Sequence, residues 1–109
     1  MTAATVIPRL LDELPIPTDG TLSRTLYQDE LLRLVGFAFA EGQELTEHSS
    51  ALSVVIQVLR GRLFLRLGEE ETELTPGGWV HMPPRLPHAV RALEPTVMLL
   101  TMITTGHDG

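Results

Sequence analysis

The chain has 109 residues and no cysteine, which predicts one domain and excludes disulfides, thiolate nucleophiles and cysteine-ligated metal sites. Eight basic residues, all arginine, face fourteen acidic ones, for a net charge of −6. They are scattered and form no basic patch, so we expect no nucleic-acid partner. The longest apolar stretches, residues 54–56 and 97–100, are too short for a membrane span, and no secretory signal is visible. These features predict a cytoplasmic protein without a membrane partner.

Residues 1–20 are a lead-in that contains Pro8, Pro15 and Pro17. Residues 9–14 carry one turn's worth of helical pattern before proline stops it, so a short helix and an extended arm are both open. We therefore divide the chain into an N-terminal arm, residues 1–20, and a β-domain, residues 21–105. His107 lies in a glycine-flanked tail that we expect to be disordered.

From residue 21 onward the chain consists of short segments that alternate apolar and polar residues and end at turn residues, which is the all-β pattern. The acidic run 69–71 is predicted to be a solvated hairpin tip, and the proline-rich residues 83–87 a stiff loop. Many short antiparallel strands in one small domain favour a sandwich or barrel, with a double-sheet jelly roll as a natural solution. The predicted strands are residues 22–28, 31–40, 48–59, 63–67, 79–82, 88–92 and 97–103.

The longest predicted strand, residues 48–59, alternates with a period of two, so every second side chain shares a face. That face is apolar from Leu52 onward and should point into the barrel. His48 stands at the start of this face, at the mouth of the barrel. An imidazole in such a place is uncommon unless it is hydrogen-bonded or bound to a metal. The predicted inward face consists of His48, Ser50, Leu52, Val54, Ile56 and Val58.

The spacing of glycines and histidines resembles the two motifs of the cupin superfamily. The first motif runs from Gly42 through His48 to Gly61, and the second runs from Gly77 to His88. The resemblance covers roughly residues 31–103. It implies a small single-domain cupin, an RmlC-like double-stranded β-helix or jelly-roll barrel with a short N-terminal arm.

The resemblance also implies a metal site of three histidines and one glutamate that face into the barrel. His48 and His88 occupy two of these positions, whereas Ser50 and Val54 stand where the second histidine and the glutamate belong. A hydroxyl is a poor ligand for a transition metal and a valine is none. Two interpretations of the histidine pair remain open: a weak divalent-metal centre (Zn, Fe, Mn, Ni or Cu), or semi-buried histidines satisfied by water and backbone. Arg85 replaces a further motif position, a glycine.

Four other side chains are candidates to complete a metal shell: His81, Glu44, Glu47 and Gln57. Strand parity turns Glu47 and Gln57 away from the barrel. Val80 and Met82 look core-facing, which favours an outward or interface position for His81.

Three functions are consistent with these residues. The first is a cupin that binds a small molecule in a pocket lined by Ser50, Leu52, Val54, Ile56 and Met82, with a weak two-histidine metal centre. The second is a metal-dependent dioxygenase, isomerase or cyclase, and the third is a metal-free sensing or structural dimer. We favour the first. We also expect a homodimer, formed through the outer face of the long strand at Val55 and Leu59, to which the arm adds by crossing to the partner.

Overall fold

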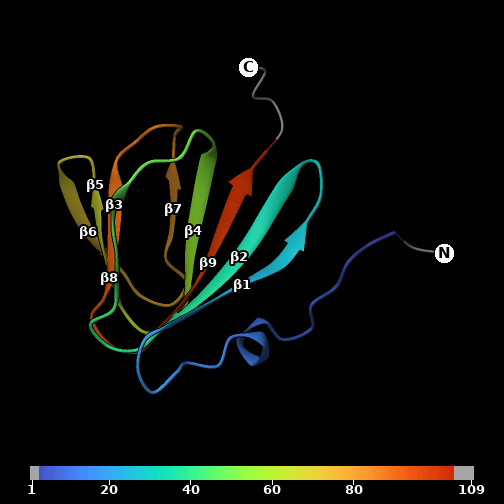
Figure 1. Cartoon of the computed structure of the whole chain (residues 1–109), viewed down its shortest axis with the longest axis horizontal. Helices are drawn as coiled ribbons and strands as arrows, with labels where there is room; N and C mark the ends of the chain where they lie inside the picture. The colour runs from blue at the N-terminus through green and yellow to red at the C-terminus, as the bar shows by residue number, and fades with distance from the viewer. Residues whose placement is uncertain (1–2, 105–109) are drawn as a thin grey trace.

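The computed structural model describes residues 3–104, and almost all of its regular structure is β (Figure 1). One short 3₁₀ helix, η1 (Leu10–Glu13), precedes the strands. The strands are β1 (Thr21–Gln28), β2 (Leu32–Phe39), β3 (Glu44–His48), β4 (Ser53–Arg60), β5 (Leu63–Leu67), β6 (Glu70–Leu74), β7 (Trp79–Met82), β8 (His88–Ala92) and β9 (Thr96–Ile103).

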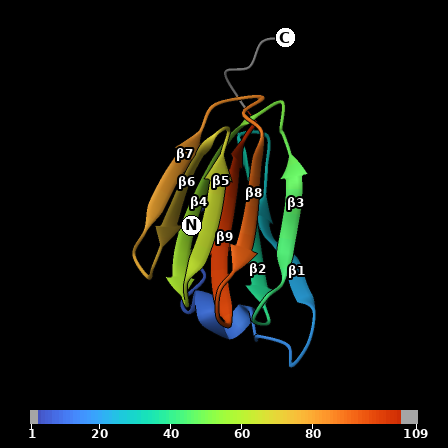
Figure 2. The ribbon, with the colours of Figure 1, turned by 90° about the vertical axis from the view of Figure 1, so that its left-hand side faces the viewer.

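All pairings within this part of the chain are antiparallel, and they form two sheets. The first sheet has the order β1-β2-β9-β4-β7 and the second the order β3-β8-β5-β6. Figure 2 shows β1 and β3 along one side of the molecule and β6 and β7 along the other. The predicted all-β jelly-roll class is confirmed.

The core lies between the two sheets. It contains Phe39, Ile56, Leu63, Leu65 and Met98, each fully buried. These residues alternate with outward-facing ones along their strands, as the period-two pattern predicts. The predicted inward positions Val54, Ile56 and Val58 are all buried in this core.

Two details of the strand prediction are wrong. Residues 48–59 are not one strand, because β3 ends at His48, residues 49–52 cross to the other sheet, and β4 begins at Ser53. The acidic run forms the hairpin tip only at Glu69, since the turn falls at residues 68–69 and Glu70 and Glu71 begin β6. The strands that the prediction missed, β3 and β6, are mostly polar and exposed. Their apolar alternation is too weak to predict a strand from the sequence.

The N-terminal arm forms a short 3₁₀ helix and then packs against the outer face of the five-stranded sheet. Leu14 is 1% exposed and clusters there with Ala38, Val97 and Leu99. Arg24 of β1 holds the arm in place by donating a hydrogen bond of 2.6 Å to the Glu13 carbonyl. In the structure the arm therefore covers its own sheet, and Leu59, which was predicted to meet a partner, packs against the arm's cluster.

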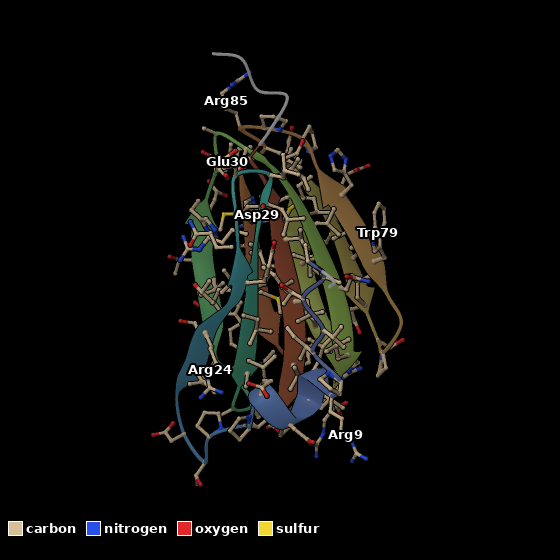
Figure 3. The ribbon with its side chains drawn as sticks, turned by 90° about the vertical axis from the view of Figure 1, so that its right-hand side faces the viewer. Arg9, Arg24, Asp29, Glu30, Trp79 and Arg85 are labelled. Carbon is tan, nitrogen blue, oxygen red and sulfur yellow. The ribbon has the colours of Figure 1, made fainter. Side chains whose placement is uncertain are left out.

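One end of the barrel carries the connections that matter for the site. Residues 49–52 join β3 to β4 and residues 83–87 join β7 to β8, and the Arg85 amide donates to the Ser50 carbonyl at 2.6 Å. The turn between β1 and β2 lies at the same end, as the labels of Asp29, Glu30 and Arg85 show (Figure 3). Within residues 3–104, no helix is long and apolar enough to cross a membrane.

Candidate functional site

His48 and His88 are direct partners in the pairing of β3 with β8. Their ring centroids lie 4.3 Å apart, with the ring planes tilted by 59°. His88 shares its face with Val90 and Ala92, which are buried in the core, so both imidazoles are on the inner face of the four-stranded sheet. His88 is 4% exposed, and His48, on the edge strand, is exposed. The structure thus brings the two predicted histidines together.

A β-bulge in β3 orients His48. Leu45 pairs with Val90 and His48 pairs with His88, so β3 has one residue more than β8 between the two pairs. This extra residue lets both Leu45 and His48 face inward although they are three positions apart. The parity argument from the sequence reached an inward His48 through a continuous strand that does not exist. The bulge, which the sequence pattern does not reveal, is the physical cause.

The backbone fixes the orientation of both rings in the same way. Nδ1 of His48 lies 2.7 Å from the Thr46 carbonyl oxygen, and Nδ1 of His88 lies 2.9 Å from the Leu86 carbonyl oxygen. Because a carbonyl only accepts, each Nδ1 carries the proton, and in the neutral ring Nε2 keeps its lone pair. A metal-bound histidine is held in this manner by a carbonyl on its other nitrogen. Within residues 3–104 neither Nε2 has a hydrogen-bond partner in the protein.

Burial lowers the pKa of His88 below its ordinary value of 6.5, and a charge on His48 lowers it further, while the Leu86 carbonyl raises it. Removing an imidazolium from water costs more than removing the neutral ring. His88 is therefore neutral at neutral pH, which is the form that coordinates a metal or accepts a hydrogen bond from a ligand.

The other two positions of the metal motif supply no ligand. Ser50 is in the loop between β3 and β4, and its Oγ accepts a hydrogen bond of 3.0 Å from the Leu52 amide. Val54 is 2% exposed and lies in the core between its strand partners Met82 and Met102. Across the described residues, no group of three or more His, Asp or Glu side chains gathers where a metal could bind. Within residues 3–104, a metal at this position would thus be held by two imidazoles and no further protein ligand.

Two of the remaining predicted pocket residues, Ile56 and Met82, are buried in the core next to Val54, and Leu52 is half-buried in the loop. Val54, Ile56 and Met82 therefore belong to the packed core below the histidine end, and of the predicted pocket residues only Ser50 and Leu52 keep partial exposure. Whether a ligand occupies this end of the barrel stays a prediction.

None of the four candidate helpers joins the pair. His81 is exposed, and its Nε2 lies 3.4 Å from the Ser53 hydroxyl, outside the barrel. Glu44, Glu47 and Gln57 are also exposed. The predicted outward position of His81 is confirmed, because its neighbours Val80 and Met82 face the core.

Arg85, which replaces the motif glycine, has a backbone conformation that disfavours a side chain. Its φ is +69°, in the left-handed region that a glycine adopts freely and an arginine does not. The loop nevertheless keeps its shape, since the Arg85 amide bonds to Ser50 and the preceding Pro83 carbonyl accepts from the Leu86 amide at 3.4 Å. The Leu86 carbonyl is thereby kept in position for the ring of His88.

Sequence reasoning missed one charged residue of the inner face, Arg33 of β2. Its direct partner on β9 is Met102, which packs against the core. A charged residue two positions before Val35, in the inward register of a strand, was the available signal. His107, predicted to be disordered, lies outside the described residues.

Comparison with known proteins agrees with this architecture. The profile of the cupin domain matches residues 37–104. A conserved protein of unknown function from Streptococcus pyogenes is 33% identical, with a TM-score of 0.82 over 94% of this chain and 90% of its own. A cupin superfamily protein from Desulfitobacterium hafniense is 19% identical, with a TM-score of 0.83 over 94% of both chains.

KdgF from a Halomonas species is 23% identical, with a TM-score of 0.75 over 78% of this chain and 81% of its own. A search of curated proteins found no match. The profile match spans more than half of the chain, and the sheets, the motif positions and the histidine pair agree with it. The chain belongs to the cupin family.

Proposed function

We propose that this cupin binds a small organic molecule at the histidine end of its barrel, where His48 and His88 are the two protein ligands of a weakly held divalent transition metal. The observation that carries the proposal is the pair of Nε2 atoms, without a hydrogen-bond partner among residues 3–104, on two rings whose centroids lie 4.3 Å apart. Each ring is held by a backbone carbonyl through Nδ1, so its orientation does not depend on the metal. The apolar side chains next to the pair suit the body of an organic ligand.

Two imidazoles leave several coordination positions for water or for the ligand. Binding is therefore expected to be weaker than in a site with four protein ligands and to be reversed by a chelator. Imidazole ligands favour the later divalent metals, rising to copper. A metal held in this way acts as a Lewis acid toward a coordinated ligand.

The test is calorimetric titration of the untagged protein with Zn²⁺ and Ni²⁺, with His48→Ala and His88→Ala as variants and His81→Ala as the matched control. Binding by the native protein and by the His81 variant, with loss in the other two, supports the metal centre. Equal binding by all four proteins rules it out. A metal-free native protein that still binds organic ligands at this end retains the small-molecule role alone.

A further inference from the structure

Arg33 points into the barrel although it is charged. It lies in register between Gln28 of β1 and Met102 of β9, and Met102 packs against the core. Direct partners across a sheet share a face, so Arg33 is on the inner face of the five-stranded sheet. Its guanidinium turns toward the edge strand, where Nη2 donates a hydrogen bond of 3.1 Å to the Thr25 hydroxyl.

The guanidinium of Arg33 is incompletely satisfied. Its Nε is buried and has no hydrogen-bond partner within residues 3–104. The ion pairs in that part of the chain are Arg24 with Glu13 and Arg62 with Glu73, so no carboxylate of residues 3–104 neutralises Arg33. A buried donor on a charged group is costly when it lacks an acceptor. A bound group that accepts from this Nε–H and carries a negative charge would satisfy the donor and offset the charge.

Arg33 lies at the same end of the barrel as the histidine pair. It is the second residue of β2, next to the β1–β2 turn, and Figure 3 shows Asp29 and Glu30 of that turn at the end occupied by Arg85. The loop of Arg85 leads directly into His88. Figure 2 shows β3 on the same side of the molecule as β1 and β2. Arg33 and the two histidines are therefore on facing inner walls at one end.

We propose that Arg33 is the anchor for an acidic ligand, a small organic molecule with a carboxylate on an apolar body. This assignment rests on the proposed function, because it places the ligand at the same end as His48 and His88. A carboxylate accepts from Nε–H and a neighbouring Nη–H together, an arrangement that suits the planar guanidinium and not a lysine. The hydrocarbon part then lies over Met102, the direct partner of Arg33, which is only partly buried.

The experiment follows the Nε–H signals of the arginines by ¹H–¹⁵N NMR while hexanoate or its neutral amide, hexanamide, is added. We expect hexanoate to shift the Arg33 Nε–H signal to saturation and hexanamide to act at least roughly tenfold more weakly. Arg33→Lys keeps the positive charge but loses Nε, and is expected to weaken hexanoate binding by about tenfold or more. Arg66→Lys, on the exposed face of β5, is the matched control and leaves the affinity unchanged.

Three results would overturn the assignment. The first is an Arg33 signal that hexanoate, benzoate and succinate all fail to move up to their solubility limits. The second is equal affinity for acid and amide. The third is a shift confined to Arg66 and Arg91, which line a hollow of about 400 Å³ on the outer face of the four-stranded sheet.

The histidine ring signals test the proposed function separately. A Zn²⁺ titration without any carboxylate that moves the rings of His48 and His88, while hexanoate leaves Arg33 unmoved, keeps the metal centre and rejects the anchor. An Arg33 response to hexanoate with histidine rings indifferent to Zn²⁺ keeps the anchor and rejects the metal. Backbone spectra of the Arg33→Lys and Arg66→Lys variants check that both are folded.

Discussion

The side chain of Leu14 fills the space above Gly36 that a Cβ at residue 36 would need. A Cβ built on Gly36 would overlap both methyl groups of Leu14, which is 1% exposed. The absence of a side chain in the middle of β2 is therefore what lets the N-terminal arm dock on the outer face of the sheet.

Gly36→Ala is accordingly expected to displace the arm and to lower the free energy of unfolding by about 1–3 kcal/mol, the usual cost of overpacking. Leu14→Ala should cost about 2–4 kcal/mol through the cavity it leaves. Because both changes act on one contact, the double variant should lose clearly less than the sum of the two. Urea denaturation of the four proteins measures this coupling. Strict additivity would contradict the contact.

Arg85→Gly is expected to stabilise the protein. An L-residue in the left-handed region costs about 1–2 kcal/mol, and Arg85 has a φ of +69°. Glycine also makes the unfolded chain more flexible, which lowers the free energy of unfolding by about 0.5–1 kcal/mol. The net gain in the free energy of unfolding should therefore be roughly 0.5 kcal/mol. Arg66→Gly, in a strand, should instead destabilise. Chemical denaturation compares the two variants, and equal losses in both would show that residue 85 bears no strain.

The pH dependence of stability should contain a contribution from His88. Its pKa is lowered in the folded state, so the unfolded chain binds more protons in the interval just below 6.5. The contribution is fully present above pH 6.5 and is lost as the pH falls from 6.5 through the folded-state pKa. The pKa of Asp29 is also lowered, first by its hydrogen bond from Tyr27, but from an ordinary value of 3.8, so its loss occurs at more acidic pH.

The measurement is the difference in unfolding free energy between about pH 7.5 and about pH 5.5. It should be larger in the native protein than in His88→Gln, and His81→Gln should behave like the native protein because that ring is exposed. A native-like pH slope in His88→Gln would refute the assignment.

Restoring the missing ligands should trade stability for metal affinity. Val54→Glu introduces a carboxyl group at a site that is 2% exposed, at an expected cost of about 3–5 kcal/mol without metal. In Ser50→His/Val54→Glu, Zn²⁺ should recover part of this cost, because metal binding stabilises the folded state that holds the ligands together. Thermal unfolding with Zn²⁺ and with a chelator measures the effect. A melting temperature that Zn²⁺ leaves unchanged would mean that position 54 does not reach the histidine pair.

Trp79 is expected to mediate a homodimer. It is 57% exposed on β7, one of the two edge strands of the five-stranded sheet, where it pairs with Gln57 of β4 (Figure 3). An unpaired edge with an exposed aromatic residue favours pairing with a second copy. Light scattering should give twice the 12.0 kDa of one chain, and Trp79→Ser should shift the protein toward the monomer. Leu31→Ser removes a similarly exposed residue, 55%, at the β1–β2 turn and should not. A native monomer would refute this prediction.

The sequence by itself determined the class of fold and the two histidines. Period-two alternation records which side of a strand is buried, and it predicted the inward positions of Val54, Ile56 and Val58. The motif glycines mark positions where the backbone conformation or a close contact excludes a side chain. Gly61, for example, has a φ of +89°, and a Cβ there would collide with the Pro95 carbonyl and with Thr96. Such signals are local, so a linear pattern carries them.

Only the tertiary structure decided how the site is built. The bulge that turns His48 inward exists because β3 pairs with β8. In this pairing His48 lies opposite His88, which is 40 residues further along the chain. The end of β3 at residue 48 depends on the crossing between sheets, which no single-strand periodicity contains. That the Nε of Arg33 lacks a partner among residues 3–104 likewise results from which strands surround it. Pairing register and burial are properties of residues brought together from distant parts of the chain, and they appear only once the two sheets have packed.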